Sequence, residues 1–193
     1  MMLDTISPLG GDFGSTNALA SIPWVTASER RDLGAVLITC AAPSPERIKS
    51  IGLAIGCSLP RSHGLVVECD GKRAIWLTPR SWLVLCETDD EARLLRSIAS
   101  NFPDRSAHAS RYSDALCWLS LEGAKAEELL NQGCFLSFSQ GGLPVGNSKR
   151  TPVAGISAVI LREAETVWTI GVERSRASYF VEWLEGLTLS GGE

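Results

Sequence analysis

The feature that most constrains the fold is an internal repeat. Two stretches of the chain, residues 31–104 and 105–193, each predict one strand, one helix, three strands and a final helix in that order. Each half is too small to cover its own sheet, so we expect the halves to pack together as one compact body. Because the strands follow one another as hairpins, a parallel doubly wound sheet is disfavoured. The sequence therefore predicts an α+β fold of two duplicated β-α-β-β-β-α halves.

Local signals define the elements of the first half. After a strand at 34–40, Ser44 followed by Pro45 is typical of a helix N-terminus. The dipeptide Asp70-Gly71 between two apolar runs predicts a β-hairpin. Thr88 and Glu91 have the spacing of a capping box, in which the two side chains close the start of a second helix.

The second half repeats this order, and single positions correspond as well. Gly56-Cys57 and Gly133-Cys134 each follow the first helix of a half, while Trp82 and Trp168 each lie in the last strand. The predicted elements of the second half are a strand at 115–122, a helix at 123–131, a weak strand at 147–153, a hairpin of 156–161 with 166–172, and a helix at 174–185.

Residues 1–30 carry little signal for regular structure. A glycine-rich stretch at 10–15 has no preceding strand and no following Lys-Ser/Thr, so it is neither a P-loop nor a dinucleotide loop. We expect these residues to form a flexible or partner-dependent N-terminal arm, in which residues 23–25 are the apolar anchor.

Charge and composition exclude several classes of protein. A net charge of −4 argues against a nucleic-acid binder. The chain has no apolar run of about 18 residues and no basic, apolar leader at its start, so neither a membrane span nor secretion is expected. None of the six cysteines lies in a CxxC motif, and we expect reduced thiols in a cytoplasmic protein.

Residues that could carry chemistry do not converge. His63 and His108 are far apart with no further metal ligands nearby, no nucleophile motif is present, and the acidic residues are scattered. Cys134 after a helix end, and the short basic stretch 148–150, are the remaining alternatives for reactivity and for contact with an anionic partner. We therefore predict no catalytic, cofactor-binding or metal-binding residue in this chain.

Tryptophan is the residue that points to a partner. Four of the six tryptophans lie in predicted strands and are expected in the core. Trp24 in the arm and Trp183, off the apolar face of the last helix, are the candidate partner contacts, because exposed aromatic residues mark interaction surfaces.

Several segments together resemble the gamma subunit family of heterotetrameric sarcosine oxidase. The strand pair at 76–85 resembles that family's tryptophan-leucine-glycine-proline motif, with Thr78 in place of the glycine. Further segments that resemble the family are 28–33, the strand, helix and glycine-cysteine block at 119–134, the hairpin region at 144–162, and the closing helix with Arg174, Tyr179 and Trp183.

The resemblance implies a non-catalytic subunit with the fold of the folate-binding domain of glycine-cleavage T-proteins. It would dock on the alpha subunit, with beta and delta subunits as further partners. The parent complex would oxidise sarcosine to glycine and pass the one-carbon unit to tetrahydrofolate. FAD, FMN, NAD, tetrahydrofolate and zinc would be bound by other subunits.

One departure and two alternatives accompany this resemblance. Where relatives often have Asp-x-Ser, this chain has Arg111-Tyr112-Ser113, which weakens the case for a folate or aminomethyl site. The first alternative is a stand-alone folate-binding or aminomethyltransferase-like protein; a related group involved in iron-sulfur maintenance has Lys-Gly-Cys where this chain has Gln132-Gly133-Cys134. The second is a homodimer formed by the isolated chain.

Overall fold

Two β-sheets organise the chain in the computed structural model, which describes residues 7–10, 18–22, 24–139 and 141–190. Each sheet belongs to its own compact unit. The five-stranded unit comprises Asp32–Asp114 and Gly146–Lys149, and the six-stranded unit comprises Met1–Arg31, Ala115–Val145 and Arg150–Glu193. Both units combine strands with helices, which confirms the α+β class.

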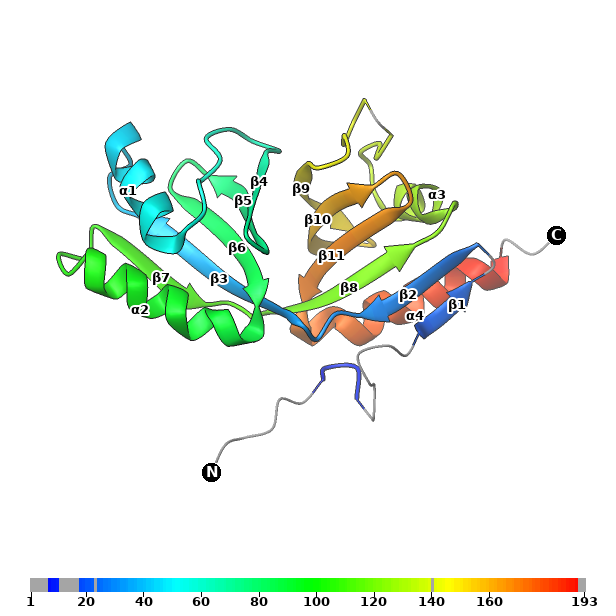
Figure 1. Ribbon diagram of the computed structural model, residues 1–193. Coiled ribbons are helices and arrows are strands. Elements are labelled where there is room, and N and C mark those ends of the chain that lie inside the picture. The colour runs from blue at the N-terminus through cyan, green and yellow to red at the C-terminus, as the bar shows by residue number, and fades with distance from the viewer. Residues whose placement is uncertain (1–6, 11–17, 23, 140, 191–193) are drawn as a thin grey trace. The chain divides into compact units, whose positions relative to one another are not determined.

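The sheet of the five-stranded unit has the order β4-β5-β6-β3-β7, with α1 and α2 packed against it (Figure 1). Each strand pair in this sheet is antiparallel. The elements are β3 (Leu33–Cys40), α1 (Pro45–Ile55), β4 (Val66–Cys69), β5 (Lys72–Thr78), β6 (Ser81–Glu87), a 3-10 turn (Thr88–Asp90), α2 (Glu91–Asn101) and β7 (Ala107–Arg111).

The N-terminus of α1 is formed as the sequence predicts, whereas that of α2 is not. Ser44 accepts a hydrogen bond from the Arg47 amide at 3.2 Å and Pro45 opens the helix. Before α2, the Thr88 hydroxyl instead donates to the Asp32 carbonyl at 3.2 Å, and a 3-10 turn precedes the helix. The predicted capping box is therefore wrong, because Glu91 is buried and bonds to β3.

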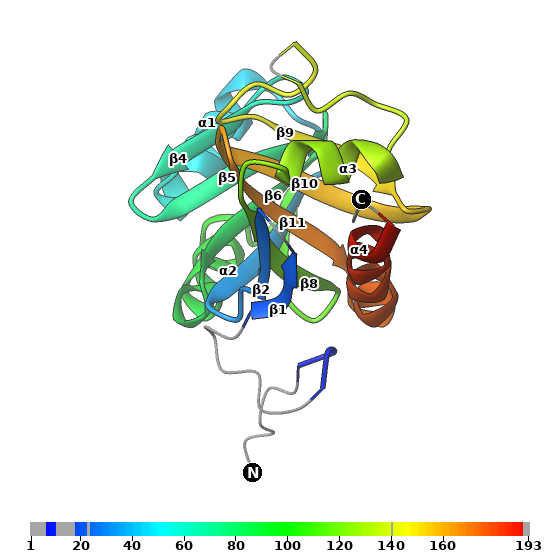
Figure 2. The same cartoon turned by 90° about the vertical axis from the view of Figure 1, so that its right-hand side faces the viewer.

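The sheet of the six-stranded unit has the order β1-β2-β8-β11-β10-β9, and α3 and α4 pack on it (Figure 2). The elements are β1 (Ala18–Ile22), β2 (Val25–Glu29), β8 (Leu116–Glu122), α3 (Ala126–Gly133), β9 (Ser148–Val153), β10 (Ile156–Ala164), β11 (Val167–Glu173), a 3-10 turn (Arg174–Arg176) and α4 (Ala177–Ser190). Strand β9 begins with two residues assigned to the five-stranded unit.

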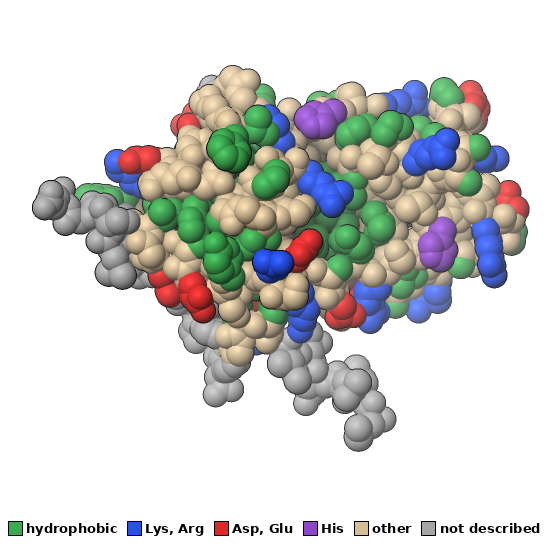
Figure 3. All heavy atoms as spheres, turned by 180° about the vertical axis from the view of Figure 1, so that it is seen from behind, with side chains coloured by type: hydrophobic (Ala, Val, Ile, Leu, Met, Phe, Trp, Pro, Cys, Tyr) green, Lys and Arg blue, Asp and Glu red, His purple; other side chains and the backbone are tan. Residues whose placement is uncertain are grey.

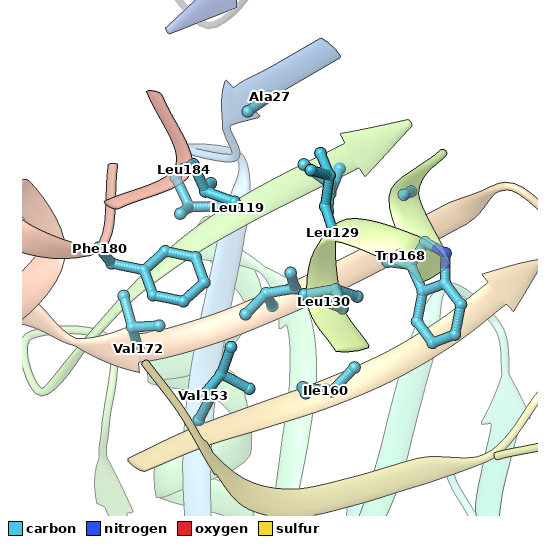
Figure 4. Packing of buried hydrophobic residues seen from close by; sticks show 14 of the residues in the cluster. Ala27, Leu119, Leu129, Leu130, Val153, Ile160, Trp168, Val172, Phe180 and Leu184 are labelled. Atoms are coloured by element: carbon cyan, nitrogen blue, oxygen red, sulfur yellow. The ribbon is translucent and has the colours of Figure 1, made fainter. Parts of the chain in front are cut away.

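The core of the six-stranded unit lies between its sheet and its two helices (Figure 4). Trp168 in β11 is fully buried, as is its counterpart Trp82 in β6 of the other unit, where the indole donates to the Pro60 carbonyl at 2.7 Å. Apolar residues at alternate strand positions and at helical spacing meet here. The core members drawn with labels are Ala27, Leu119, Leu129, Leu130, Val153, Ile160, Trp168, Val172, Phe180 and Leu184.

Three strands lie outside the predicted repeat. Part of the expected arm forms β1 and β2, and β2 pairs with β8 from Thr26 to Glu29, so this part of the arm is a piece of the sheet. The five-stranded unit extends to 114 and not to 104, because β7 pairs with β3. Residues 1–6 and 11–17 of the expected arm lie outside the described residues.

Candidate functional site

Three exposed apolar residues belong to a single connecting segment between a helix and a strand. The segment joins α3 to β9 and comprises residues 134–147; we call it the α3–β9 loop. Residue 140 lies outside the described residues, and residues 134–145 belong to the six-stranded unit. Phe135 is fully exposed, with a relative accessibility of 108%. Leu136, the next residue, and Val145, further along the same loop, are 42% and 43% exposed. The sequence reasoning did not single out these three residues, because the number of apolar residues in a loop does not show which of them are buried.

The buried side chain of Arg162 holds this loop from the core. Its Nη1 donates to the carbonyl oxygens of Phe138 and Leu143, at 2.9 and 3.1 Å. Its Nη2 donates to Glu127 Oε2 at 3.1 Å, and the guanidinium lies 4.7 Å from the Trp168 ring centroid. A guanidinium bonded on two sides fixes the backbone around it. The fully exposed Phe135 therefore belongs to a loop with an anchored backbone.

Packing inside the loop fixes it further. Phe138 is fully buried and meets the Trp168 ring edge-on at 5.8 Å, while its amide donates to Asn131 Oδ1 at 2.9 Å. A β-carbon at Gly142 would collide with the Ser137 carbonyl. The loop is thus fixed both by contacts within it and by contacts with residues of the core.

Trp24, the first predicted partner contact, is exposed. Its relative accessibility is 74%, and it has a positive φ of 75° in the turn between β1 and β2. Its backbone lies against Gly123, where a β-carbon would collide with the Trp24 carbonyl. A close backbone contact thus positions the turn while the indole remains accessible.

Trp183, the second predicted partner contact, is half-buried. Its ring covers Gly133, where a β-carbon would lie 2.5 Å from it, and it packs on Phe180 with ring centroids 5.5 Å apart. Trp183 therefore supports the last residue of α3, directly before the α3–β9 loop. Both tryptophans stay predicted partner contacts.

Other exposed apolar side chains are scattered. Tyr179 on α4 is 52% exposed, and in the five-stranded unit Leu53 and Leu65 are 74% and 44% exposed. These three residues lie on different segments of the chain, and single exposed apolar residues are normal on protein surfaces. The α3–β9 loop differs because three such residues share one anchored segment.

The buried carboxylates are engaged inside the chain. Glu91, 2% exposed, accepts from the Ala35 amide at 3.0 Å, from Ser113 Oγ and from Arg111 Nε at 2.8 Å. Arg111, which stands where relatives often have the aspartate of Asp-x-Ser, and Ser113, which matches the serine, thus both pair with Glu91. This cluster ties α2 to strand β3 and to the end of β7.

A second buried carboxylate, Glu29, is held in the same way in the other unit. It accepts from Ser7 Oγ at 2.7 Å and from Arg31 Nε at 3.0 Å, and Cys117 Sγ lies 3.8 Å away. Burial and the charge of Glu29 raise the pKa of Cys117 to about 12. Cys117 is therefore a protonated thiol at neutral pH and a poor nucleophile.

The remaining candidates do not form a reactive centre. His63 lies edge-on to Trp76 at 5.8 Å, His108 is exposed in β7, and the two imidazoles lie apart on the surface (Figure 3). Cys134 contacts Thr151 Oγ1 at 3.5 Å, and residues 148–150 lie in β9. Within the described part of the chain no three His, Cys, Asp or Glu side chains gather to hold a metal ion. No helix among the described residues is long and apolar enough to cross a membrane.

Comparison with known proteins gives one family and one fold. A family model described as "Sarcosine oxidase, gamma subunit family" matches residues 40–189. No curated protein matches the sequence. The fold is similar to a chain of heterotetrameric sarcosine oxidase from Corynebacterium sp. U-96, with a TM-score of 0.80 and 23% identity over 91% of this chain and 90% of that one.

The fold is also similar to a larger protein. Glycine cleavage system aminomethyltransferase T from Bartonella henselae matches with a TM-score of 0.61 and 11% identity over 84% of this chain. The match covers 46% of that chain, so the present chain corresponds to about half of it. The expected T-protein-like fold is thereby confirmed.

Proposed function

The chain belongs to the sarcosine oxidase gamma subunit family, and from that membership we propose that it is a non-catalytic subunit that docks on the alpha subunit of its complex. The complex would oxidise sarcosine to glycine and pass the one-carbon unit to tetrahydrofolate. FAD, FMN, NAD, tetrahydrofolate and zinc would be held by the other subunits. We place the complex in the cytoplasm, which the six free cysteines support.

The observation that carries the docking proposal is the fully exposed Phe135 on the anchored α3–β9 loop. An aromatic side chain costs free energy when it is exposed to water, and it gains most when it enters an apolar pocket of a partner. Because the loop is ordered by Arg162 before binding, little conformational entropy would be lost on docking. We therefore propose Phe135 as the central contact, with Leu136 and Val145 of the same loop as further contacts.

The test is co-expression with the alpha subunit, followed by size-exclusion chromatography and titration of the purified chains. Phe135→Asp places a charge in the proposed contact and should weaken the affinity by about 30-fold or more, the scale of a central interface residue. Leu53→Asp is the matched control, since Leu53 is an exposed apolar residue of the five-stranded unit. That variant should co-elute like the unaltered chain.

Two results would contradict the proposal. Equal affinities for the unaltered chain and Phe135→Asp would remove the loop from the interface, and failure of the unaltered chain to co-elute at micromolar concentration would remove the docking function. Calorimetry of the isolated chain with tetrahydrofolate addresses the stand-alone alternative, because micromolar binding would favour a folate-binding protein. Sedimentation of the isolated chain would reveal a homodimer.

A further inference from the structure

Two cysteines of the five-stranded unit lie against each other. Cys57 follows Gly56, whose left-handed backbone (φ 67°) ends α1, and Cys69 is the last residue of β4. The Cys57 thiol lies 3.7 Å from the carbonyl oxygen of Val67, and an interaction with the Cys69 thiol contributes to the raised pKa of Cys57. Val67 lies two positions before Cys69 in β4, so the Cys57 thiol lies against the backbone of the strand that carries Cys69. The end of α1 thus brings the two sulfurs together.

The pair borders a cavity that small molecules can enter. The cavity has a volume of about 490 Å³, and both cysteines line it together with Lys49, Arg61 and Asp70. Cys57 is 3% exposed, whereas Cys69 is half-buried. A small oxidant entering this cavity therefore reaches Cys69 first.

The repeat provides a natural comparison in the six-stranded unit. Cys134 follows α3 as Cys57 follows α1, and its Sγ lies 3.5 Å from Thr151 Oγ1 in β9. Strand β9 follows α3 as β4 follows α1. The same place in the fold therefore sets a thiol against a thiol in one unit and against a hydroxyl in the other.

We propose that Cys57 and Cys69 are a modification site, a dithiol that hydrogen peroxide converts to an intrachain disulfide. The Cys69 thiolate attacks one peroxide oxygen, the O–O bond breaks, and the hydroxide that leaves takes a proton to become water. The Cys57 sulfur then attacks the Cys69 sulfenic acid, the S–O bond breaks, and a second water leaves with the Cys57 proton. Two electrons pass from the sulfurs to one peroxide. The proposal does not depend on the docking function.

The environment of each sulfur agrees with these roles. Burial, and the hydrogen bond that it makes with Cys69, raise the pKa of Cys57 to about 12, so Cys57 is a protonated thiol at neutral pH. Cys86 and Cys117 are buried, and each has a carboxylate neighbour that adds to a pKa of about 12. Oxidation of Cys86 and Cys117 is therefore disfavoured, whereas Cys57 and Cys69 border the cavity.

The experiment treats the full chain with hydrogen peroxide, blocks free thiols after denaturation, and maps peptides by mass spectrometry without reduction. We expect two of the six thiols to be lost, with Cys57 and Cys69 joined in one cross-linked peptide pair. In Cys57→Ser the reaction should stop at the Cys69 sulfenic acid, which dimedone captures. The variant Cys134→Ser should form the 57–69 disulfide as the unaltered chain does.

A second variant tests the comparison between the units. Thr151→Cys should add a second disulfide, to Cys134, under the same treatment. The proposal is overturned if Cys57 and Cys69 are both still free thiols after the peroxide treatment, or if the new cross-link joins any other pair of native cysteines. Capture of no sulfenic acid on Cys69 in Cys57→Ser would overturn the order of attack.

Discussion

Gly171, in the middle of β11, has no side chain, and a neighbouring residue fills the space that a side chain would occupy. The ring of Trp118, its direct cross-strand partner, occupies that space, and a β-carbon on Gly171 would lie 2.5 Å from it. An aromatic ring that covers a glycine on the neighbouring strand is a recognised way to stabilise a sheet. Position 171 is thus closed to any larger residue unless Trp118 moves.

We predict that Gly171→Ala lowers the free energy of unfolding by about 1–3 kcal/mol, because overpacking forces the buried Trp118 out of place. Gly186→Ala in α4 is the matched control, since no atom lies within 4 Å of its added β-carbon. The free energy of unfolding of that variant should rise by about 0.5–1 kcal/mol, because alanine has a higher helix propensity than glycine. Urea unfolding measures both, and equal effects of the two substitutions would refute this account.

Glu91 shows where residue-scale prediction from the sequence ends. Its spacing from Thr88 matches a capping box, but its carboxylate lies among Ala35, Arg111 and Ser113. Those partners are 20 or more positions away in the chain, and a local motif carries no information about them. The pairing of Glu91 with Arg111 comes from the docking of α2 beside β3 and β7.

At the scale of an element, the N-termini of α1 and α2 differ, because a side-chain cap forms at α1 and not at α2. Ser44→Ala removes the side-chain bond to the Arg47 amide and should destabilise the protein by about 1 kcal/mol. Thr88→Ala should lower the free energy of unfolding by less than Ser44→Ala does, because Thr88 does not cap α2 and its hydroxyl is exposed. Thermal unfolding of both variants checks this prediction. A larger loss of stability in Thr88→Ala than in Ser44→Ala would support a capping role for Thr88.

Elements with strong apolar patterns could be predicted, and those without them could not. The helices and hairpins of both halves follow the sequence signals closely. The missed strands β1, β2 and β7, with the sequences ALASI, VTASE and AHASR, are rich in alanine and serine and have weak strand propensity. Two of them owe their conformation to a long-range partner, since β2 pairs with β8 and β7 pairs with β3.

The candidate contact surface was only partly accessible to sequence reasoning. Trp24 could be singled out because it lies outside every predicted element, and it is exposed. Phe135 could not be singled out, because its exposure depends on which residues of the loop Arg162 holds against the core by hydrogen bonds. In the sequence, Arg162 is a charged residue that directly follows a predicted hairpin strand.

At the scale of the whole molecule, the N-terminal segment is predicted to be required for the six-stranded unit. Deleting residues 1–30 removes β2 and with it the buried Val25 and Ala27, leaving β8 as an open sheet edge. We expect the melting temperature to fall by about 10 °C, from roughly 3–5 kcal/mol of lost burial and pairing. Calorimetry of the truncated chain measures this fall.

A point variant keeps that prediction testable if the truncated chain fails to express. Ala27→Asp leaves the segment in place but puts a charge into a fully buried position, so its melting temperature should also fall. An unchanged melting temperature in either variant would mean that the segment is dispensable, as a flexible arm would be.

The chain crosses between its two units at residues 31–32 and again at 114–115, so β2 and its partner β8 are separated by the whole of Asp32–Asp114. On the ribosome the first strands emerge long before the strand that they pair with. Elongation at about 5–20 residues per second leaves them waiting for roughly 5–20 s. During that interval the five-stranded unit can complete most of its own sheet. Synthesis therefore favours an order in which the segment between the two strands folds first. The pairing of β2 with β8 forms afterwards, although β2 is among the first residues to be synthesised.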